Sequence, residues 1–353
     1  MANLKYKRGK LSDIFGNRLV FRELNPVGNS LPQFPEIKTA LSLTKLPRKK
    51  DKEYAKALYY IFSKAGNFNK VFYIGDTLMS DASVIENFSE FPDIETFGII
   101  TREGETDTIE FRKNFLLNGR WANLERAFSI CEEKVFRADE RTVLIIDIDK
   151  TAIGARGRND RAIDKARIDA IRELAEEIFG EINEEKFSKA YQIANRKEFF
   201  YITEDNQDIV SLLAFFIYDG AVSETELSGG KFENAKELIE KVSVRNSVLK
   251  KYAETVLKNI EEKNPTAFPE FRKKEFLKTI ARADFLPDET PIAKLLSEEI
   301  TITGEVYRLA LMLKKRGVVV FGVSDKPALS TMPEEGSGLP PVYEKTMKIY
   351  SEV

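Results

Sequence analysis

The sequence predicts an α/β fold built on a doubly wound parallel sheet, with a second, mostly helical domain inserted into it. Three short apolar runs, at 71–74, 143–146 and 318–323, each end abruptly at a polar residue. Continuous runs rich in β-branched residues are typical of strands buried on both faces, as in parallel sheets. Helical patterns precede the first and third runs, and strands that alternate with helices indicate βαβ units.

The elements around these strands follow in chain order. Residues 51–65 carry apolar side chains at helical spacing, and Gly66 is positioned to end that helix. Thr303 is a candidate N-cap for another helix, which ends at Gly317 directly before the third strand. Residues 346–353 form a further candidate strand. In such sheets, ligands bind outside the carboxyl ends of the strands.

The segment 155–301 has a different character and predicts a separate helical domain. It is rich in helix-forming residues, and its clearest helical patterns lie at 166–179, 187–197, 234–242 and 246–260. We therefore expect a core made of 1–154 and 302–353, and a helical domain at 155–301. The alternative is a set of helices packed directly on the sheet.

The composition excludes several classes of site and partner. None of the 353 residues is histidine, which excludes Ser-His-Asp and Cys-His nucleophilic sites and His-ligated zinc. Cys131 is the only cysteine, so no internal disulfide can form, and a reducing, cytoplasmic location is expected. The 57 acidic and 55 basic residues nearly balance, and no apolar run reaches the ~18 residues of a membrane span. Neither nucleic acid nor a membrane is therefore expected as a partner, and the oligomeric state is not indicated.

Four acids at strand ends and turns are the candidates for chemistry. Asp147 and Asp149 follow the second apolar run, and Asp76 and Asp81 flank the turn after the first. Two carboxylates ~5 Å apart repel by roughly 3 kcal/mol at an effective dielectric constant of about 20. A cluster of them is tolerable when one is protonated or when a cation lies among them, and oxygen ligands favour Mg²⁺. The alternative is that these acids end strands and turns and share no site.

Sequence motifs around these acids resemble those of the haloacid dehalogenase-like (HAD) phosphohydrolases. The segment Asp147-Ile148-Asp149-Lys150-Thr151 resembles the DxDxT first motif of that superfamily. The run ending at Ser324 looks like the second motif, a strand that ends in Ser or Thr, and Gly75–Asp81 looks like the fourth, GDxxxxD. The third motif is a lysine before a helix, and Lys49 or Lys50 occupies that place, 27 or 26 residues before Asp76.

The motifs stand in the order three, four, one, two, whereas the family order is one to four. A circular permutation preserves the same arrangement in space, because domain termini often lie close together. It requires that 346–353 continue towards the N-terminal segment and that 94–140 join the fourth motif to the first. The resemblance then implies a Rossmann-like core with a helical cap inserted between the first and second motifs.

The resemblance also implies a reaction and the residues that perform it. Asp147 would attack the phosphorus of a small phosphorylated metabolite and form an aspartyl-phosphate. Asp149 would protonate the leaving alcohol and then deprotonate the hydrolytic water. Ser324 and the motif-three lysine, with Lys49 preferred over Lys50, would hold the phosphoryl oxygens. The enzyme class implied is a phosphoric monoester hydrolase.

Mg²⁺ is the cofactor that the resemblance implies. Asp76 and Asp147 would bind it together with the backbone carbonyl of Asp149, and Asp81 would bind it directly or through water. The alternatives are a phosphotransferase or mutase with the same intermediate, and a receiver-like or non-catalytic phosphate-binding module.

Three basic residues near the motifs have open roles. Arg156 or Arg158 could bind an anionic substrate. The favoured alternative is a hinge loop in which Asn159 or Asp160 caps the next helix. Lys326 could likewise contact substrate or belong to the turn that ends the strand.

Overall fold

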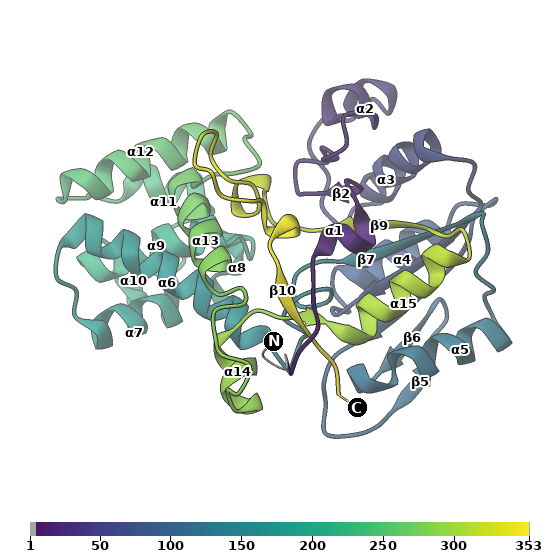
Figure 1. The fold of residues 1–353 in the computed structure, drawn as a ribbon. Helices are drawn as coiled ribbons and strands as arrows, with labels where there is room; N and C mark the ends of the chain where they lie inside the picture. Colours follow the sequence, from purple (N-terminus) through teal and green to yellow (C-terminus); the bar gives the residue numbers. More distant parts are fainter. Residues whose placement is uncertain (1–4, 353) are drawn as a thin grey trace. The chain divides into compact units, whose positions relative to one another are not determined.

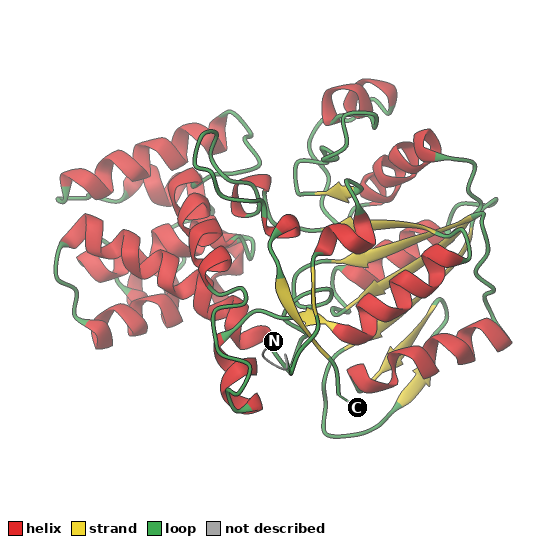
Figure 2. Ribbon diagram, in the orientation of Figure 1, coloured by secondary structure: helices red, strands yellow, loops and turns green. Residues whose placement is uncertain are grey.

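The structure, a computed structural model, describes residues 5–352, and these residues form two compact units. The first unit consists of the chain up to Ala166 and from Thr279 onward, and the second of Arg167–Lys278. All strands lie in the first unit, and the described part of the second is entirely helices and loops (Figures 1 and 2). The α/β class is confirmed.

A seven-stranded, mostly parallel sheet is the centre of the first unit. Its strand order is β2-β9-β7-β3-β4-β6-β5, and every neighbouring pair is parallel except β5 and β6. The strands are β2 (Leu19–Val20), β3 (Lys70–Gly75), β4 (Glu95–Thr101), β5 (Ile109–Phe111), β6 (Phe115–Asn118), β7 (Thr142–Asp147) and β9 (Val319–Val323). The three predicted strands are therefore neighbours, in the order β9, β7, β3 at the middle of the sheet.

Helices cover both faces of this sheet. On one face Val71 and Tyr73 of β3 belong to the same buried cluster as residues of α3 (Lys52–Ala65) and α4 (Asp81–Ser89). On the other face Phe72 packs edge-on against Phe128 of α5 (Leu124–Lys134) at 5.1 Å between ring centroids. Alternate residues of β3 thus enter different layers, which is why the strand is apolar from Val71 to Ile74.

The predicted helices on either side of the strands form close to their expected bounds. α3 starts after Asp51 and is followed by Gly66, as predicted. α15 (Gly304–Lys315) starts after Thr303, which occupies the N-cap position as predicted, although its hydroxyl makes no capping hydrogen bond. The remaining helices of this unit are α1 (Leu11–Phe15), α2 (Phe34–Ala40), α14 (Ile292–Glu298) and the short 3-10 turns η1 (Trp121–Asn123), η3 (Ala328–Ser330) and η4 (Val342–Glu344).

The two ends of the chain meet in a small second sheet. It has the order β1-β10-β8, with β1 (Arg8–Gly9), β10 (Met347–Tyr350) and β8 (Ile302–Thr303). The strand predicted at the C-terminus is β10, and it pairs with β1 through Arg8↔Lys348 and Gly9↔Met347. The first and last strands of the chain are therefore neighbours in space, as a permuted core requires; Val353, the last residue of the predicted strand, lies outside the described residues.

The helical unit has its own core. Its buried side chains form one cluster that includes Phe187, Phe215, Phe268 and Phe271. Its helices are α7 (Glu184–Ala194), η2 (Lys197–Phe199), α8 (Phe200–Thr203), α9 (Gln207–Asp219), α10 (Glu224–Ser228), α11 (Ala235–Lys241) and α12 (Ser247–Glu261), together with parts of α6 (Asp160–Phe179) and α13 (Pro269–Ala281). The unit is shorter at both ends than the predicted 155–301, because α6 and α13 begin or end in the first unit.

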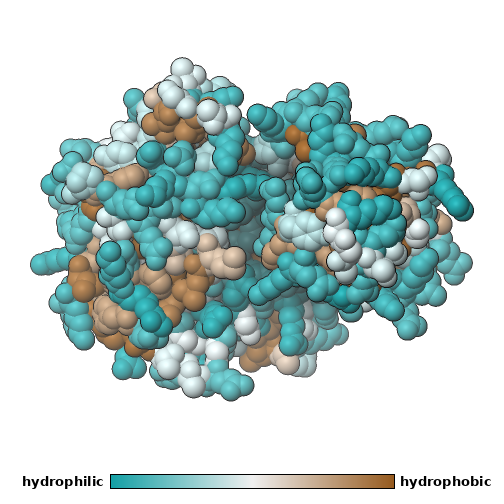
Figure 3. All heavy atoms as spheres, turned by 180° about the vertical axis from the view of Figure 1, so that it is seen from behind, coloured by the Kyte–Doolittle hydropathy of each residue, from teal (hydrophilic) through white to brown (hydrophobic). Residues whose placement is uncertain are grey.

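The outer surface carries mainly hydrophilic side chains on the face drawn in Figure 3, with scattered hydrophobic groups. Among the described residues, no helix is both long and apolar enough to span a membrane. Cys131 is buried on α5 with a free thiol. Burial raises the pKa of this thiol to about 12, so it is not a reactive thiolate.

Candidate active site

Three parallel strands bring the predicted chemical groups to one edge of the sheet. β7 ends at Asp147, β3 ends one residue before Asp76, and β9 ends one residue before Ser324. The register pairs Asp147 with Val323, and Ile146 with Ile74. Because the strands are parallel and in register, their carboxyl ends meet, and the expectation of a shared site holds for these groups.

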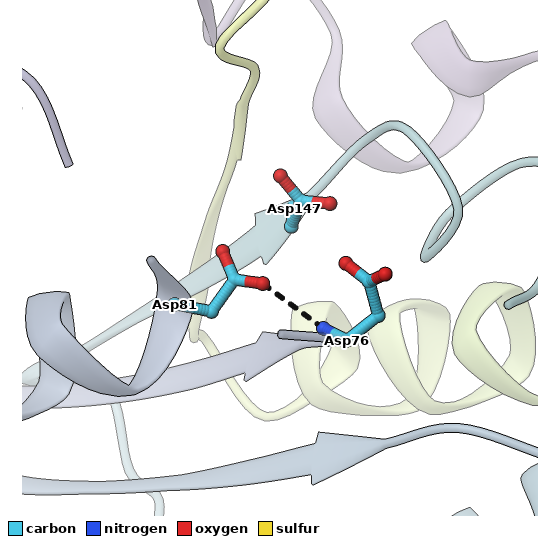
Figure 4. A group of neighbouring side chains, drawn as sticks. All are labelled: Asp76, Asp81 and Asp147. Carbon is cyan, nitrogen blue, oxygen red and sulfur yellow. Dashed lines mark hydrogen bonds between the residues drawn. The ribbon is translucent and has the colours of Figure 1, made fainter. Parts of the chain in front are cut away.

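Asp76, Asp81 and Asp147 form a buried group of acids that could hold a metal ion. One carboxylate oxygen from each lies within 4.8 Å of the other two. The three residues are only 5 %, 1 % and 5 % exposed. In Figure 4 their side chains converge from the ends of β3 and β7 and from the start of α4. All the donors are carboxylate oxygens, the type that hard cations such as Mg²⁺ prefer.

Gly75 allows the turn between the first two of these acids to close tightly. A Cβ atom on Gly75 would lie 2.6 Å from both Cβ and Cγ of Asp81. Real Cβ atoms do not approach other carbon atoms so closely, so any larger residue would push the Asp81 side chain away. The glycine of the GDxxxxD pattern is therefore required here by steric contact.

Lys49 is the basic residue within this group. Its Nζ donates to Asp81 Oδ1 at 2.9 Å and forms an ion pair with Asp147 Oδ1. The side chain is 3 % exposed, and Nζ is 4.0 Å from a carboxylate oxygen of Asp325. Lys50, the adjacent alternative, is exposed, so assigning the site lysine to Lys50 is wrong. The turn before α3 directs only one of the two consecutive lysines inward.

Asp81 is held more firmly than the other two acids. Its carboxylate accepts five hydrogen bonds, from Lys49, Tyr73 Oη, Thr77 N, Thr77 Oγ1 and Asp76 N. Burial disfavours its charge, but Lys49 and the hydroxyl donors outweigh burial and lower the pKa of Asp81 below its ordinary value. Asp81 therefore stays ionised and fixes the orientation of Lys49.

Asp76 and Asp147 are destabilised as anions. Burial, reinforced by the charge of Asp81, raises the pKa of Asp76 from 3.8 to about 7, although Arg156 opposes the shift. Burial also raises the pKa of Asp147 well above its ordinary value, against the effect of Lys49. Three buried acids here face two bases, and a proton or a metal ion among them would offset the excess negative charge.

Asp149 lies beside the group of three acids and has different partners. Ser324 Oγ donates to Asp149 Oδ2 at 2.7 Å, and Lys326 Nζ is 2.9 Å from Asp149 Oδ1. The backbone N–H of Lys326 donates to Ser324 Oγ at 3.0 Å. The Asp149 carboxylate does not belong to the group of acids that could hold a metal. The metal contact predicted for Asp149 is through its backbone carbonyl, so this observation does not test it.

Arg156 and Arg158, the two arginines that could bind substrate, have different partners in the structure. Arg156 Nε donates to Asp76 Oδ2, so this arginine belongs to the site. Arg158 forms a two-pronged ion pair with Glu305, at 3.0 and 2.9 Å, and its side chain is 4 % exposed. A buried guanidinium paired in this way is part of the fold, so the expectation that Arg158 contacts substrate is wrong.

The hydrogen bonds of this loop do not include the predicted side-chain cap of α6 by Asn159 or Asp160. α6 begins at Asp160, whose carboxylate accepts from Gly157 N at 3.1 Å. The Asn159 amide instead donates to the carbonyls of Leu296 and Glu299 and accepts from Thr301. Asn159 therefore joins the loop to the segment that leads into β8.

Three further side chains support the site. Tyr73 and Thr77 donate to Asp81 at 2.8 Å each, and Thr151 donates to Asp76 Oδ1 at 3.3 Å. Thr151 stands in the first motif and Thr77 directly after Asp76, so both could have been proposed from their positions. Tyr73 lies inside an apolar strand, and no pattern distinguishes it from a packing residue.

Comparison of the chain with family models, with curated proteins and with solved structures finds no match in any of the three. The functional interpretation therefore depends on the site itself.

Proposed function

We propose that this protein is a Mg²⁺-dependent phosphohydrolase of small phosphorylated metabolites, acting through an aspartyl-phosphate on Asp147. The observation that carries the proposal is the meeting of Asp76, Asp81 and Asp147 with Lys49 at the carboxyl edge of the sheet. Those positions are the ones that the HAD-like motifs assign to metal, nucleophile and phosphate binding. Three motifs separated in sequence supply this group, and Ser324 of the remaining motif donates to Asp149 beside it.

The acidic group fits Mg²⁺. Asp76 and Asp147 would bind it, with Asp81 acting directly or through a water molecule, because the Asp81 oxygens already accept five hydrogen bonds. When bound, the ion would neutralise negative charge on the phosphoryl group and on the two carboxylates.

The remaining chemistry belongs to the side chains. The Asp147 carboxylate attacks phosphorus, the P–O bond to the leaving group breaks, and Asp149 gives its proton to the departing alkoxide. Asp149 then removes a proton from water, which attacks the aspartyl-phosphate and releases inorganic phosphate and free Asp147. Lys49 and Ser324 bind phosphoryl oxygens, and Lys49 also offsets the charge of the acids.

The contacts of Asp149 orient its carboxylate and stabilise its ionised form, which suits the role of base towards water. Ser324 and Lys326 hold its carboxylate from both oxygens, so it stays oriented beside the nucleophile. A bound phosphoryl group would take the Ser324 hydroxyl as a donor, and this would leave Asp149 free to exchange its proton. Lys326 is in this view a positioning residue for Asp149.

The architecture supports the same proposal. The strands that carry the first, second and fourth motifs are adjacent, and β1 pairs with β10 where a permuted chain would need its ends to lie together. We propose a permuted, Rossmann-like HAD core, with the helical unit as a cap inserted between Asp149 and Ser324.

The experiment is a phosphate-release assay with an aryl phosphate. We expect turnover with Mg²⁺, loss of turnover with EDTA, and loss of turnover in Asp147→Asn. Turnover that Asp147→Asn leaves intact would contradict the proposal. Transfer of phosphate to an added alcohol without release would identify a phosphotransferase, and stable phosphorylation without turnover would identify a receiver-like module.

A further inference from the structure

Arg156 stands between the acidic group and the outside of the site. Its Nε forms an ion pair with Asp76 Oδ2, while its side chain is 36 % exposed and that of Asp76 only 3 %. One part of the guanidinium therefore neutralises a buried acid while the side chain remains accessible. Asp76 is also the acid that the proposed function assigns to Mg²⁺.

The loop that carries Arg156 is firmly held. The Arg156 carbonyl accepts from Glu103 N at 2.9 Å and from Trp121 Nε1 at 3.0 Å, and its N–H donates to the Lys150 carbonyl at 2.8 Å. Gly157 has φ +79°, and a Cβ there would lie 2.7 Å from the Glu103 carbonyl oxygen. The backbone is thus fixed in place, and only the arginine side chain can move.

A metal ion and this guanidinium compete for one carboxylate. Asp76 Oδ1 accepts from Thr151 and Oδ2 from Arg156, so both of its oxygens already have a donor. A divalent cation on Asp76 would lie within a few ångströms of a positively charged group, and like charges at that distance repel. Lys49 also pairs with an acid of the group, but its side chain is 3 % exposed and that of Arg156 is 36 % exposed, so Arg156 is the base that can give way to the ion.

We propose that Arg156 is a built-in counterion that Mg²⁺ displaces from Asp76, and that the released guanidinium then binds the phosphoryl group of the substrate. This inference rests on the proposed function. The loop that carries Arg156 is anchored beside Asp76, so the displaced side chain stays near the site. A guanidinium group binds phosphate through two parallel hydrogen bonds. The displacement makes metal binding precede productive binding of the phosphorylated substrate.

Because Arg156 and the metal ion would bind the same carboxylate, the proposal predicts changes in metal and phosphate affinity that can be measured. If Arg156 and the ion exclude each other on Asp76, removing Arg156 must tighten metal binding. If the released Arg156 binds phosphate, the same substitution must weaken phosphate binding to the metal-loaded protein. A residue that only stabilises the loop would produce neither the tighter metal binding nor the weaker phosphate binding.

The experiment is calorimetric titration of the full chain with Mg²⁺ alone, and then with inorganic phosphate at saturating Mg²⁺, at about pH 8 where free carboxylates are ionised. We expect Arg156→Gln to bind Mg²⁺ about ten- to a hundredfold more tightly than the unsubstituted protein, the range that a hydrogen bond to a charged group contributes. We expect the same variant to bind phosphate about tenfold more weakly.

Arg161→Gln is the matched control, since Arg161 is an exposed arginine five positions further on, at the start of α6. It should change neither affinity. If Arg156→Gln is unstable, Arg156→Met provides the second variant: it keeps an unbranched side chain without the charge, and it should also tighten Mg²⁺ binding and weaken phosphate binding.

Each other result overturns a defined part of the account. Unchanged or weaker Mg²⁺ binding in Arg156→Gln, with metal still bound by the unsubstituted protein, overturns this inference and leaves the proposed function standing. Tighter Mg²⁺ binding with unchanged phosphate affinity also overturns it, because Arg156 would then be a counterion only. Failure of the unsubstituted protein to bind Mg²⁺ would overturn the proposed function and this inference with it.

Discussion

Each of the two units of this protein buries a cluster of charged side chains, and the clusters differ in their balance. In the helical unit, Arg272 lies between Asp208 and Glu275, and Arg167 also contacts Glu275. Asp208 and Glu275 are fully buried, and Asp208 accepts a further hydrogen bond from Ala267 N at 2.9 Å. In these ion pairs two acids meet two bases.

The cluster at the sheet edge has one acid more than it has bases. Asp76, Asp81 and Asp147 face Lys49 and Arg156 there. Both clusters include fully buried charges, so burial alone does not identify a functional site. An excess of negative charge among buried groups is a better indication of such a site, because it persists only where a proton or a cation neutralises it. The difference is the reason that the proposed chemistry is placed in the first unit and that the second cluster is expected to contribute stability.

The largest expected effect is on catalysis. Asp147→Asn removes the nucleophile while keeping its shape, so phosphate release should fall by at least about a thousandfold. The matched change in the other cluster, Asp208→Asn, should leave the rate per folded molecule unchanged. The assay is steady-state hydrolysis of an aryl phosphate with Mg²⁺, and equal losses in both variants would remove the distinction between the clusters.

The next effect is on stability and concerns the helical unit. Arg272→Met leaves Asp208 and Glu275 buried without their shared base, and breaking a buried pair costs about 3–5 kcal/mol of unfolding free energy. Denaturant unfolding followed by circular dichroism measures this loss. Arg196→Gln, at an exposed pair with Glu224, is the control and should have a much smaller effect. A similar loss in both variants would contradict the structural role of the buried cluster.

Metal should stabilise the protein through the first cluster only. At a Mg²⁺ concentration about a hundred times its Kd, binding adds about 2.7 kcal/mol to the stability of the folded state. The thermal midpoint should therefore rise with Mg²⁺ and fall again with EDTA. The rise should disappear in Asp147→Asn and persist in Arg272→Met. The reverse pattern would mean that the metal binds in the helical unit and would contradict the proposed site.

The smallest effect concerns a charge pair of the first unit, Arg8 and Asp288, whose side chains are 23 % and 8 % exposed. Arg8 lies 2.6 Å from Asp288, and this hydrogen bond lowers the pKa of Asp288 from 3.8 to about 2. Its stabilising contribution is therefore complete above about pH 4, and it is lost as the pH falls towards about 2. Acid titration of unfolding stability should show a shallower decline for Asp288→Asn than for the unsubstituted protein. An identical decline would mean that this pair adds nothing.

The sequence predicted the strands that build the site because β3, β7 and β9 are continuous apolar runs. It could not reveal β2 or β8, since each has two residues and no pattern of its own. Tertiary contact, not local pattern, makes those segments strands.

Predictions of side-chain partners from sequence were accurate only where a motif specifies the position. The acids of the first and fourth motifs were identified by position, but the choice between Lys49 and Lys50 depends on how one turn is oriented. The pairing of Arg158 with Glu305, residues 147 positions apart, is invisible without the fold. The same is true of Asp208 and Arg272, which lie on different helices.

The central claim is that the unbalanced cluster transfers a phosphoryl group through Asp147, and trapping that intermediate tests it most directly. Borohydride added during turnover with an aryl phosphate and Mg²⁺ reduces an acyl phosphate to an alcohol, which would convert the Asp147 side chain into that of homoserine. We expect peptide mass spectrometry to find this change at position 147, and to find none when EDTA is present. Turnover in the presence of Mg²⁺ with no reduction at position 147, or with reduction at another acid, would contradict the account.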